Sequence, residues 1–384
     1  MTRKPADNPE DIPRRRRRRA VTVAEILDFL EYLAPPSLAS PPAPSGLQVG
    51  TAFTPVKNIV VTPLATYNAI SCAAVYKAAL IICAAPLLAG PLTELRWDNP
   101  IGAKVAHLVQ RQISLYILSN AYAAAPGGFD DSLAERLGLA VSGALVPTAA
   151  EVQLKLVVFV PLESVERVQK AASEAGAGII GNYTNCAFRS PGTGTFLPHE
   201  GANPAIGQVG KLEEVEEIRL EMLVPERELQ GVVAAVLEAH PYEEVAYDIY
   251  PLRNPGVVYG RGRIGELPLG VSLDTVLAQV NDALTLTAEN PARCSHRPSQ
   301  PIRSLAVASG MSAGESLLWA AHRQGAGALV TGGATLTDLM LADSTDTVLI
   351  DVGFAPSVAP GLQRLVAQLR DTFDSDGMHV LYVP

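Results

Sequence analysis

Short apolar runs and amphipathic stretches alternate along residues 21–150. In Val23–Leu33 the apolar residues recur at the spacing that places them on one face of a helix. Short runs without polar residues, bounded by turn residues, favour strands that are buried on both faces. The pattern predicts strands at 59–62, 80–83 and 114–118, and helices at 66–79, 101–112 and 130–137. This alternation predicts an α/β layer in which helices cover a sheet.

The pattern changes near residue 152. Leu154–Val160 is predicted to be a strand and Glu163–Ala175 an amphipathic helix, and Gly-rich turns with short strands follow over residues 176–210. A further strand, helix and strand are predicted at 215–223, 228–239 and 246–251. A β-α-β…β-α-β order over about 100 residues is typical of the ferredoxin-like arrangement.

The first pattern returns after residue 254. It predicts strands at 304–308, 328–331 and 347–351, and helices at 315–324 and 360–373. The sequence therefore predicts an α/β core that is interrupted by a ferredoxin-like α+β insert. The expected parts are a tail (1–20), the first half of the core (21–150), the insert (151–253) and the second half of the core (254–384).

Composition supports a folded α/β protein with enough apolar material for more than one domain. The chain has 384 residues, of which 48% are hydrophobic and only 5% aromatic, so it is neither fibrous nor disordered in character. Its four cysteines are scattered without a CxxC pair, which favours a reducing cytoplasm. Acidic residues at 25, 28 and 31 interrupt any apolar core of a secretory leader.

The formal net charge of −9 conceals a basic tail that contains six consecutive arginines, Arg14–Arg19. Such a run could contact nucleic acid or an anionic surface. Because the rest of the chain offers no basic face to cooperate with it, we expect a disordered, solvated tail. Nucleic acid is therefore expected as a partner only through this tail.

One segment, Ala69–Leu92, is apolar enough to imitate a membrane span. Lys77 lies near its middle, Pro86 and Pro91 lie near its end, and its composition changes from Ala-rich to Ile-rich at Leu80. A buried helix followed by a central strand explains these features, and no membrane partner is expected.

Several short motifs resemble one family. Gly46–Gly50, Ile81–Pro86, Ala123–Gly128 and Asp351–Val358 are similar to segments of the NIF-three-like family, whose members are often named GTP cyclohydrolase I type-two homologues. The runs Gly181–Phe188, Gly194–Phe196, Glu200–Pro204 and His240–Glu244 resemble the insert of the longer bacterial members, which is similar to the trimeric PII and CutA proteins. The resemblance implies a toroidal homohexamer with the inserts capping its openings.

The resemblance also implies a pair of divalent metal ions, held in the family by His, Asp and Glu side chains. The positions that match these ligands are Ala84, Ala85, Ala123, Phe354 and Val358. None of these side chains has a lone pair to donate to a metal ion. Neighbouring family residues are also replaced, by Pro42–Pro44, Pro63–Leu64, Thr331–Gly333 and Thr337. We therefore expect no metal cofactor, although substitute ligands from elsewhere stay an alternative.

Two glycine motifs suggest other chemistry. Gly260–Gly265 satisfies G-x-G-x-x-G, but Glu266, Leu267 and Pro268 follow where a nucleotide site needs a helix, so a β-turn between insert and core is preferred. Gly310–Gly314 satisfies G-x-S-x-G between a predicted strand and a predicted helix. A structural turn is preferred there to a nucleophilic Ser312, although Asp351 and His379 follow in the required order.

Three polar motifs are given structural roles. Pro241 interrupts any helix through His240–Glu244, so His240 is expected to shape a helix-to-strand junction or a trimer contact. Cys294 and His296 are expected on a surface loop, and Cys186 is expected to be a small buried hydrophobe.

Three functions follow from the sequence, which by itself assigns no catalytic or cofactor-binding residue. The preferred hypothesis is a non-catalytic oligomeric scaffold or binding protein that has lost its metal site, with a possible small-molecule ligand in the insert. The first alternative is a metal-dependent hydrolase of the GTP cyclohydrolase I type-two class. The second alternative is a serine hydrolase acting through Ser312.

Overall fold

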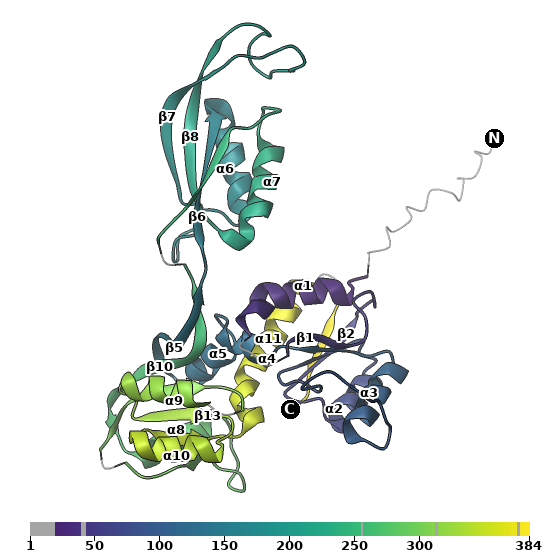
Figure 1. Cartoon of the computed structure of the whole chain (residues 1–384), viewed down its shortest axis with the longest axis vertical. Helices are drawn as coiled ribbons and strands as arrows, with labels where there is room; N and C mark the ends of the chain where they lie inside the picture. Colours follow the sequence, from purple (N-terminus) through teal and green to yellow (C-terminus); the bar gives the residue numbers. More distant parts are fainter. Residues whose placement is uncertain (1–19, 40–43, 255, 299, 312–313, 375–376) are drawn as a thin grey trace, which may run out of the picture. The chain divides into compact units, whose positions relative to one another are not determined.

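The computed structural model describes residues 20–39, 44–254, 256–298, 300–311, 314–374 and 377–384. The described residues form two compact units, a core that lies within 20–148 and 260–384 and an insert that lies within Ala149–Tyr259. The core is mixed α/β, as the sequence predicts, and Figure 1 shows its elements and those of the insert.

One sheet of the core has five strands in the order β1-β4-β3-β2-β15. These strands are β1 (Gly46–Val49), β2 (Asn58–Thr62), β3 (Leu80–Cys83), β4 (Ser114–Ile117) and β15 (His379–Tyr382). β15 pairs in parallel with β2, so the last strand of the chain completes a sheet built from its first third. The helices of this region are α1 (Val23–Leu33), α2 (Tyr67–Val75), α3 (Pro100–Gln110), α4 (Ser119–Ala124) and α5 (Phe129–Arg136).

The apolar segment 69–92 forms most of α2 followed by the fully buried strand β3. Thr66 caps α2 by accepting a hydrogen bond from the amide of Ala69, 3.1 Å away, which fixes where the helix begins. Alternate residues of β3, including Ile81 and Cys83, pack against α2 and α3. Among the described residues, the helices are too short or too polar to cross a membrane.

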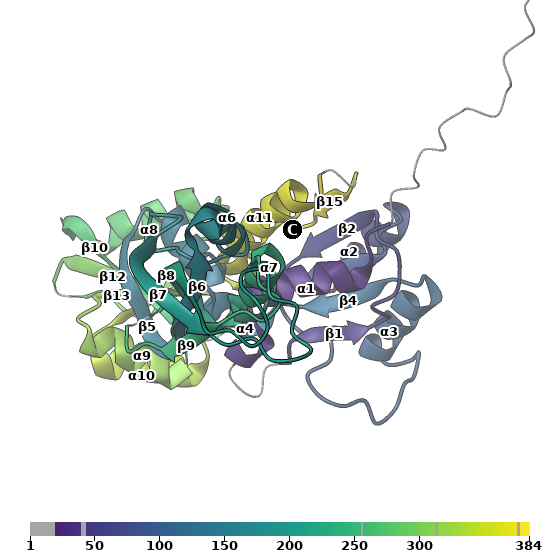
Figure 2. The same ribbon diagram turned by 90° about the horizontal axis from the view of Figure 1, so that it is seen from above.

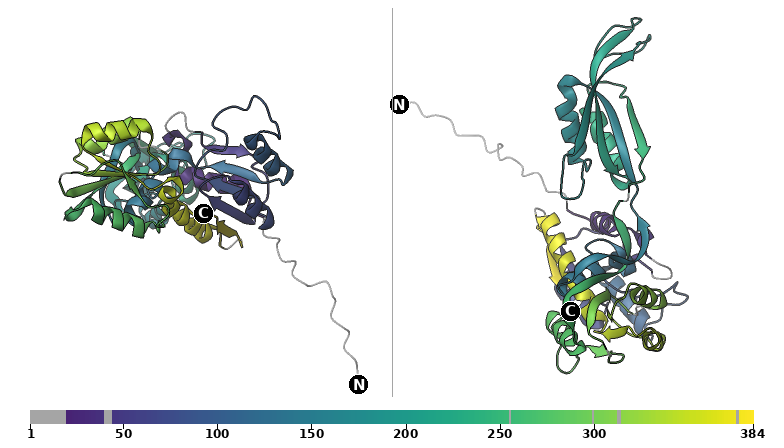
Figure 3. Two further views of the ribbon diagram at one scale, coloured as in Figure 1. Left: turned by 90° about the horizontal axis from the view of Figure 1, so that it is seen from below. Right: turned by 90° about the vertical axis from the view of Figure 1, so that its left-hand side faces the viewer.

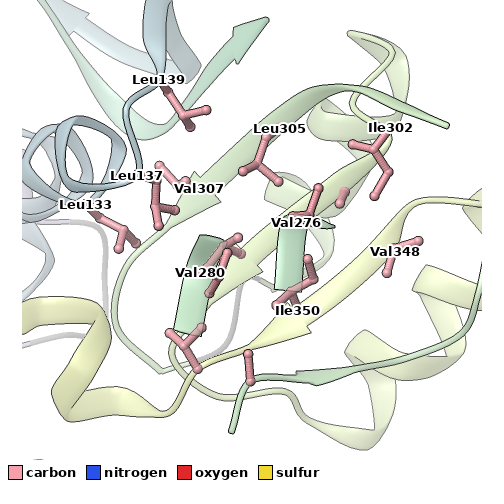
Figure 4. Packing of buried hydrophobic residues seen from close by; sticks show 14 of the residues in the cluster. Leu133, Leu137, Leu139, Val276, Val280, Ile302, Leu305, Val307, Val348 and Ile350 are labelled. Atoms are coloured by element: carbon pink, nitrogen blue, oxygen red, sulfur yellow. The ribbon is translucent and has the colours of Figure 1, made fainter. Parts of the chain in front are cut away.

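The other sheet of the core has six strands in the order β11-β14-β13-β12-β10-β5. They are β5 (Ala140–Ala150), β10 (Val258–Val271), β11 (Arg293–Cys294), β12 (Ile302–Ala308), β13 (Ala328–Thr331) and β14 (Val348–Asp351). Figure 2 shows α8 (Leu273–Ala283) on one side of this sheet, with α9 (Gly314–Arg323) and α10 (Leu336–Thr345) on the other. In Figure 4, Val276 and Val280 of α8 meet the strand residues Leu305, Val307 and Ile350 in one buried cluster.

The last helix, α11 (Phe354–Phe373), begins earlier than the sequence predicts. Pro360 was expected to begin this helix, but it lies inside it and is buried. Gly353, with φ of +80°, precedes the helix, and its amide donates to Oδ1 of Asp351 at 2.8 Å. This turn starts the helix at Phe354, and burial of the helix compensates for the backbone hydrogen bond that Pro360 removes.

The insert has the ferredoxin-like arrangement that the sequence predicts. Its sheet is antiparallel, with the order β7-β8-β6-β9. The elements follow the chain as β6 (Gln153–Pro161), α6 (Val165–Glu174), β7 (Ala187–Phe196), β8 (Glu213–Pro225), α7 (Leu229–Ala239) and β9 (Tyr247–Pro251). Figure 3 shows α6 and α7 on one face of this sheet, and Leu156, Leu220 and Val236 are part of the core that they cover. No helix of the described insert covers the other face.

Several elements carry no clear local pattern, and the sequence predicts them only in part, as short strands among turns, or not at all. β7 contains Pro191, Gly192 and Gly194 and is mostly exposed, and β10 contains the motif Gly260–Gly265. These segments become strands because neighbouring strands supply their backbone partners, which is a long-range effect. β1, β5, β15, α4, α8 and α10 were likewise not predicted.

Candidate functional site

Two positions that match family metal ligands lie at the end of β3 and in α4. Ala84 donates its amide to the carbonyl of Thr62 at 3.3 Å and accepts from the amide of Ser119 at 3.1 Å. Ser119 has φ of +54°, an uncommon backbone conformation for a residue with a side chain. Ala123 lies in the same short helix that Ser119 begins. Ala84 and Ala123 are 4% and 2% exposed, so their methyl groups are buried.

Phe354 and Val358 lie in the first turns of α11, after β14 of the six-stranded sheet. Val358 is 1% exposed. Between them, Ser357 accepts a hydrogen bond from the amide of Gly310 at 3.1 Å and donates to the carbonyl of Phe354 at 2.7 Å. The first turn of α11 is therefore attached to the glycine turn after β12. Ala85 and Phe354 are half-buried.

The donor set at these five positions does not fit a dinuclear metal centre. Methyl, isopropyl and benzyl groups have no lone pairs, whereas two adjacent dications need several oxygen or nitrogen ligands. Within the part of the chain that the structure describes, no group of three His, Cys, Asp or Glu side chains is arranged to hold a metal ion. Thr337, at a position where the resemblance implies a histidine, lies exposed on α10.

A buried polar cluster around Asp130 was not found from the sequence. Asp130, at the start of α5, is 0% exposed. Its carboxylate accepts from the amide and hydroxyl of Ser309 at 2.7 and 2.5 Å, from the amide of Gly262 at 2.6 Å, and from Nε of Arg261 at 3.1 Å. The adjacent Asp131 forms an ion pair with buried Arg263. The cluster links α5 to β10 and β12.

This cluster explains the motif Gly260–Gly265, and it corrects the expected β-turn. The motif lies within strand β10, whose residues Arg263 to Glu266 pair with β12. A side chain at Gly262, with φ of +67°, would meet Leu145 at 2.9 Å. The glycine is therefore needed for backbone conformation and packing, and no helix follows that could hold a dinucleotide phosphate.

The described residues do not bring Asp351 and His379 together as a Ser-His-Asp triad requires. Ser312 itself lies outside the described residues. The carboxylate of Asp351 accepts from the amides of Ala334 and Gly353 at 3.0 and 2.8 Å. His379 begins β15, which belongs to the five-stranded sheet, whereas Asp351 ends β14 of the six-stranded sheet. Asp351 therefore does not orient the imidazole of His379, as the carboxylate of a triad would.

His240 has the structural role expected from the sequence. It follows α7 directly, its Nε2 lies 3.0 Å from the carbonyl of Phe159, and its Nδ1 lies 3.1 Å from the amide of Tyr242. Burial lowers the pKa of His240. The imidazole thereby fixes the junction between α7 and β9.

The expectations for three cysteine and histidine residues were wrong. Cys294 and His296 were placed on a surface loop, but both are half-buried, and Cys294 belongs to strand β11 beside β14. The hydroxyl of Ser295 accepts from the amide of Leu349 at 3.0 Å, which holds this segment against the sheet. Cys186 was expected to be buried, but it is only half-buried because it precedes the exposed strand β7.

The uncovered face of the insert contains a cavity of about 550 Å³. Its walls come from β6, β7 and β8, from the loop 197–206, and from residues 242–246 after α7. Glu217 and Tyr242 are its buried polar groups. Such a volume is typical of small-molecule sites, and the sequence offered no signal for this cavity beyond the general resemblance of the insert.

Comparison with known proteins gives a consistent answer. The family model for Duf34/NIF3 (NGG1p interacting factor 3) matches residues 21–383. The chain is 38% identical over 307 residues to a "GTP cyclohydrolase 1 type 2 homolog" of Halalkalibacterium halodurans, covering 80% of this chain and 81% of that protein. It is 40% identical over 302 residues to the protein of the same name from Mycobacterium tuberculosis, covering 78% of each chain.

Solved structures agree with this result. A Bacillus cereus protein related to NIF3 superposes with a TM-score of 0.84 at 34% identity, covering 95% of this chain and 97% of that one. A Staphylococcus aureus protein shares the fold, with a TM-score of 0.66 at 21% identity over 95% of this chain and 96% of that one. The motifs, the two-sheet core with its insert, and these matches together establish that the chain belongs to the Duf34/NIF3 family.

Proposed function

We propose that this protein is a member of the NIF3 family without the two-metal chemistry, and that it acts as a non-catalytic, oligomeric binding protein. The observation that carries the proposal is the buried apolar packing of Ala84, Ala123 and Val358, at most 4% exposed, where the resemblance implies metal ligands. Removing ligands one at a time would leave unpaired buried carboxylates, which are costly, whereas replacing them together with apolar groups avoids that penalty.

The proposal includes a homohexamer, as the family resemblance implies, and a ligand carried by the insert. The insert supports this assignment because one face of its sheet has no covering helix among the described elements and contains a cavity. We propose the cytoplasm as its compartment, and the four free cysteines support this choice.

Metal content and oligomeric mass, measured on the same purified sample, test this proposal. After incubation with excess zinc or manganese and removal of the free ion, elemental analysis is expected to find well below one metal ion per chain. Mass photometry is expected to give six chains per particle. Stoichiometric metal that requires the core would refute the proposed loss of the metal site.

A metal-dependent hydrolase of the GTP cyclohydrolase class is the second candidate, because curated relatives at 38–40% identity carry the name "GTP cyclohydrolase 1 type 2 homolog". It requires ligands at other positions of the chain. Turnover of GTP that disappears with a chelator and returns with added metal would favour it over our proposal. We expect no turnover above a buffer control.

A further inference from the structure

The cavity in the insert is lined by strands and by a loop. Phe159 of β6, the β7 residues 190–196, and Glu217 and Arg219 of β8 form part of the lining. Part of the loop 197–206 completes it, and the amide of Asn203 donates to Oε1 of Glu243 at 3.1 Å. This hydrogen bond joins the loop to the segment that follows α7, and the cavity is present without a ligand.

Glu217 is the only acid of this cavity that is nearly buried, at 9% exposed. Gly194 makes room for it, because a Cβ atom at that position would lie 2.2 Å from Oε2 of Glu217. No ion pair with Glu217 occurs among the described residues, and the nearby Arg219 pairs with Glu221 at 3.0 Å. A buried carboxylate without a cation is unfavourable in the empty protein.

Tyr242 is the second polar group of the cavity. Its hydroxyl is buried beside the carboxylate of Glu217 and has no partner at strict hydrogen-bond geometry within the described chain. Burial raises the pKa of Tyr242 most, and hydrogen bonding with the adjacent Glu217 carboxylate and the charge of that carboxylate raise it further, so the hydroxyl stays protonated. Its ring lies 6.1 Å from that of Phe196, centroid to centroid. Aromatic faces and a carboxylate therefore share one enclosure.

These groups select for one kind of ligand. An anion would be repelled by Glu217 and by the rim residues Glu243 and Glu244. A neutral apolar ligand would leave the carboxylate unpaired and less solvated than before. A metal ion would find one buried carboxylate among aromatic and aliphatic walls, which is too few ligands. An ammonium group can pair with the carboxylate while its carbon atoms contact the aromatic rings.

We propose that this cavity binds a small organic cation, in which an ammonium group is attached to an apolar body. The ammonium contacts Glu217, the hydroxyl of Tyr242 lies beside the carboxylate, and Phe159 and Phe196 contact the apolar part. This inference rests on the proposed function, which assigns a ligand to the insert, and it names the chemical class of that ligand.

The test uses the full chain and three organic cations as probes: phenethylammonium, butylammonium and tetramethylammonium. Isothermal titration calorimetry is expected to detect at least one of them at millimolar concentration, with one site per chain. The neutral 2-phenylethanol and the anionic phenylacetate are expected to bind at least tenfold more weakly than phenethylammonium. Absence of binding by all three cations overturns the inference, and so does equal binding of the alcohol. If a second copy of the chain covered this face of the insert in solution, none of the three cations would bind, and the inference would be overturned.

Two variants locate the site. Glu217→Gln keeps the shape of the side chain and is expected to weaken cation binding at least tenfold. Glu216→Gln is the matched control, because Glu216 is the exposed neighbour on β8 and does not line the cavity. Both variants should show wild-type circular dichroism. Unchanged binding in Glu217→Gln would overturn the inference.

The two proposals can fail separately. All titrations are run in the presence of a chelator, and metal content is measured on the same preparation. Stoichiometric metal together with Glu217-dependent cation binding would refute only the proposed loss of metal chemistry. A metal-free protein whose cation binding is independent of Glu217 would refute only the present inference.

Discussion

Two buried carboxylates, Asp130 in the core and Glu217 in the insert, have opposite surroundings. Asp130 accepts four hydrogen bonds, from Ser309, Gly262 and Arg261, and is 0% exposed. Glu217 is 9% exposed and has no ion pair among the described residues. A buried carboxylate with a complete set of hydrogen-bond donors stabilises the folded protein, whereas a buried carboxylate without a cation lowers its free energy of unfolding.

This difference between the two carboxylates indicates that ligand binding is to be expected in the insert and not around Asp130. At three positions that match family metal ligands, Ala84, Ala123 and Val358, the side chains are apolar and buried. Among the described core residues, the buried hydroxyl of Thr331 is the polar side-chain atom left without a partner, and it does not line the cavity of the insert. In the insert, the buried hydroxyl of Tyr242, which has no partner at hydrogen-bond geometry, lines a formed cavity beside Glu217. Proteins retain such unfavourable arrangements mainly at functional sites, because a ligand supplies the missing partner.

The largest expected effect follows from Asp130→Asn. The amide cannot balance Arg261, and its NH₂ group would face donors rather than acceptors. We expect a loss of about 3–5 kcal/mol in the free energy of unfolding. Urea denaturation measures it, and Glu135→Gln is the control, because Glu135 lies on the same helix but is exposed beside Arg364. Equal stability of the two variants would contradict the contrast between core and insert.

A smaller effect is expected from Gly194→Ala. Its Cβ would displace the Glu217 carboxylate, lowering stability by about 1 kcal/mol and abolishing cation binding. Gly90→Ala is the control, since no atom lies within 4 Å of the added Cβ and Gly90 does not line the cavity. Thermal melting measures the stability of both variants, and isothermal titration calorimetry measures their affinity for the cation. Wild-type cation affinity in Gly194→Ala would contradict the assigned site.

The third effect is the pH dependence of the insert. The pKa of His240 is lowered from its ordinary value of 6.5, chiefly by burial, although the carbonyl of Phe159 and the charge of Glu217 oppose this shift. The unfolded chain therefore binds a proton that the folded insert binds less well, and stability falls as the pH falls below about 6.5. Hydrogen exchange of insert amides is expected to accelerate from pH 7 to pH 5 by more than the intrinsic rate change explains. His240→Asn should remove this excess.

The smallest expected effect on stability comes from Glu217→Gln. Because no ion pair is lost, the free energy of unfolding should stay within about 0.5 kcal/mol of wild type or rise slightly. Chemical denaturation in the absence of cations measures it. A loss comparable to that of Asp130→Asn would mean that the carboxylate has partners in the protein, and the contrast would disappear.

Much of the secondary structure follows from local pattern. Helix Val23–Leu33 and strands Leu80–Cys83 and Ala328–Thr331 have the predicted bounds, because their apolar spacing and burial agree. For β7 the prediction gave only short strands among turns, and it missed the start of α11. In β7, glycines and a proline conceal a strand whose partner is distant in the sequence, and in α11 a buried proline lies inside the helix.

The candidate site divides in the same way. The side chains at Ala84, Ala123 and Val358 are fixed by the sequence, and so is their inability to bind a metal ion. The roles of Gly260–Gly265 and Cys294 were misjudged, because each depends on a strand pairing that their neighbours in the sequence do not encode. Nothing local distinguishes Asp130 from Asp131, although one is fully buried and the other is not.

The sequence by itself determined the α/β character, the family motifs and the apolar side chains at the positions matched to metal ligands, since these depend on side-chain identity and short-range spacing. Only the tertiary structure decided that β15 completes the first sheet, that Asp130 is surrounded by donors, and that Glu217 is buried beside Tyr242 without an ion pair. The physical reason is that burial and hydrogen-bond partners are properties of contacts between distant segments, which exist only once the chain is folded.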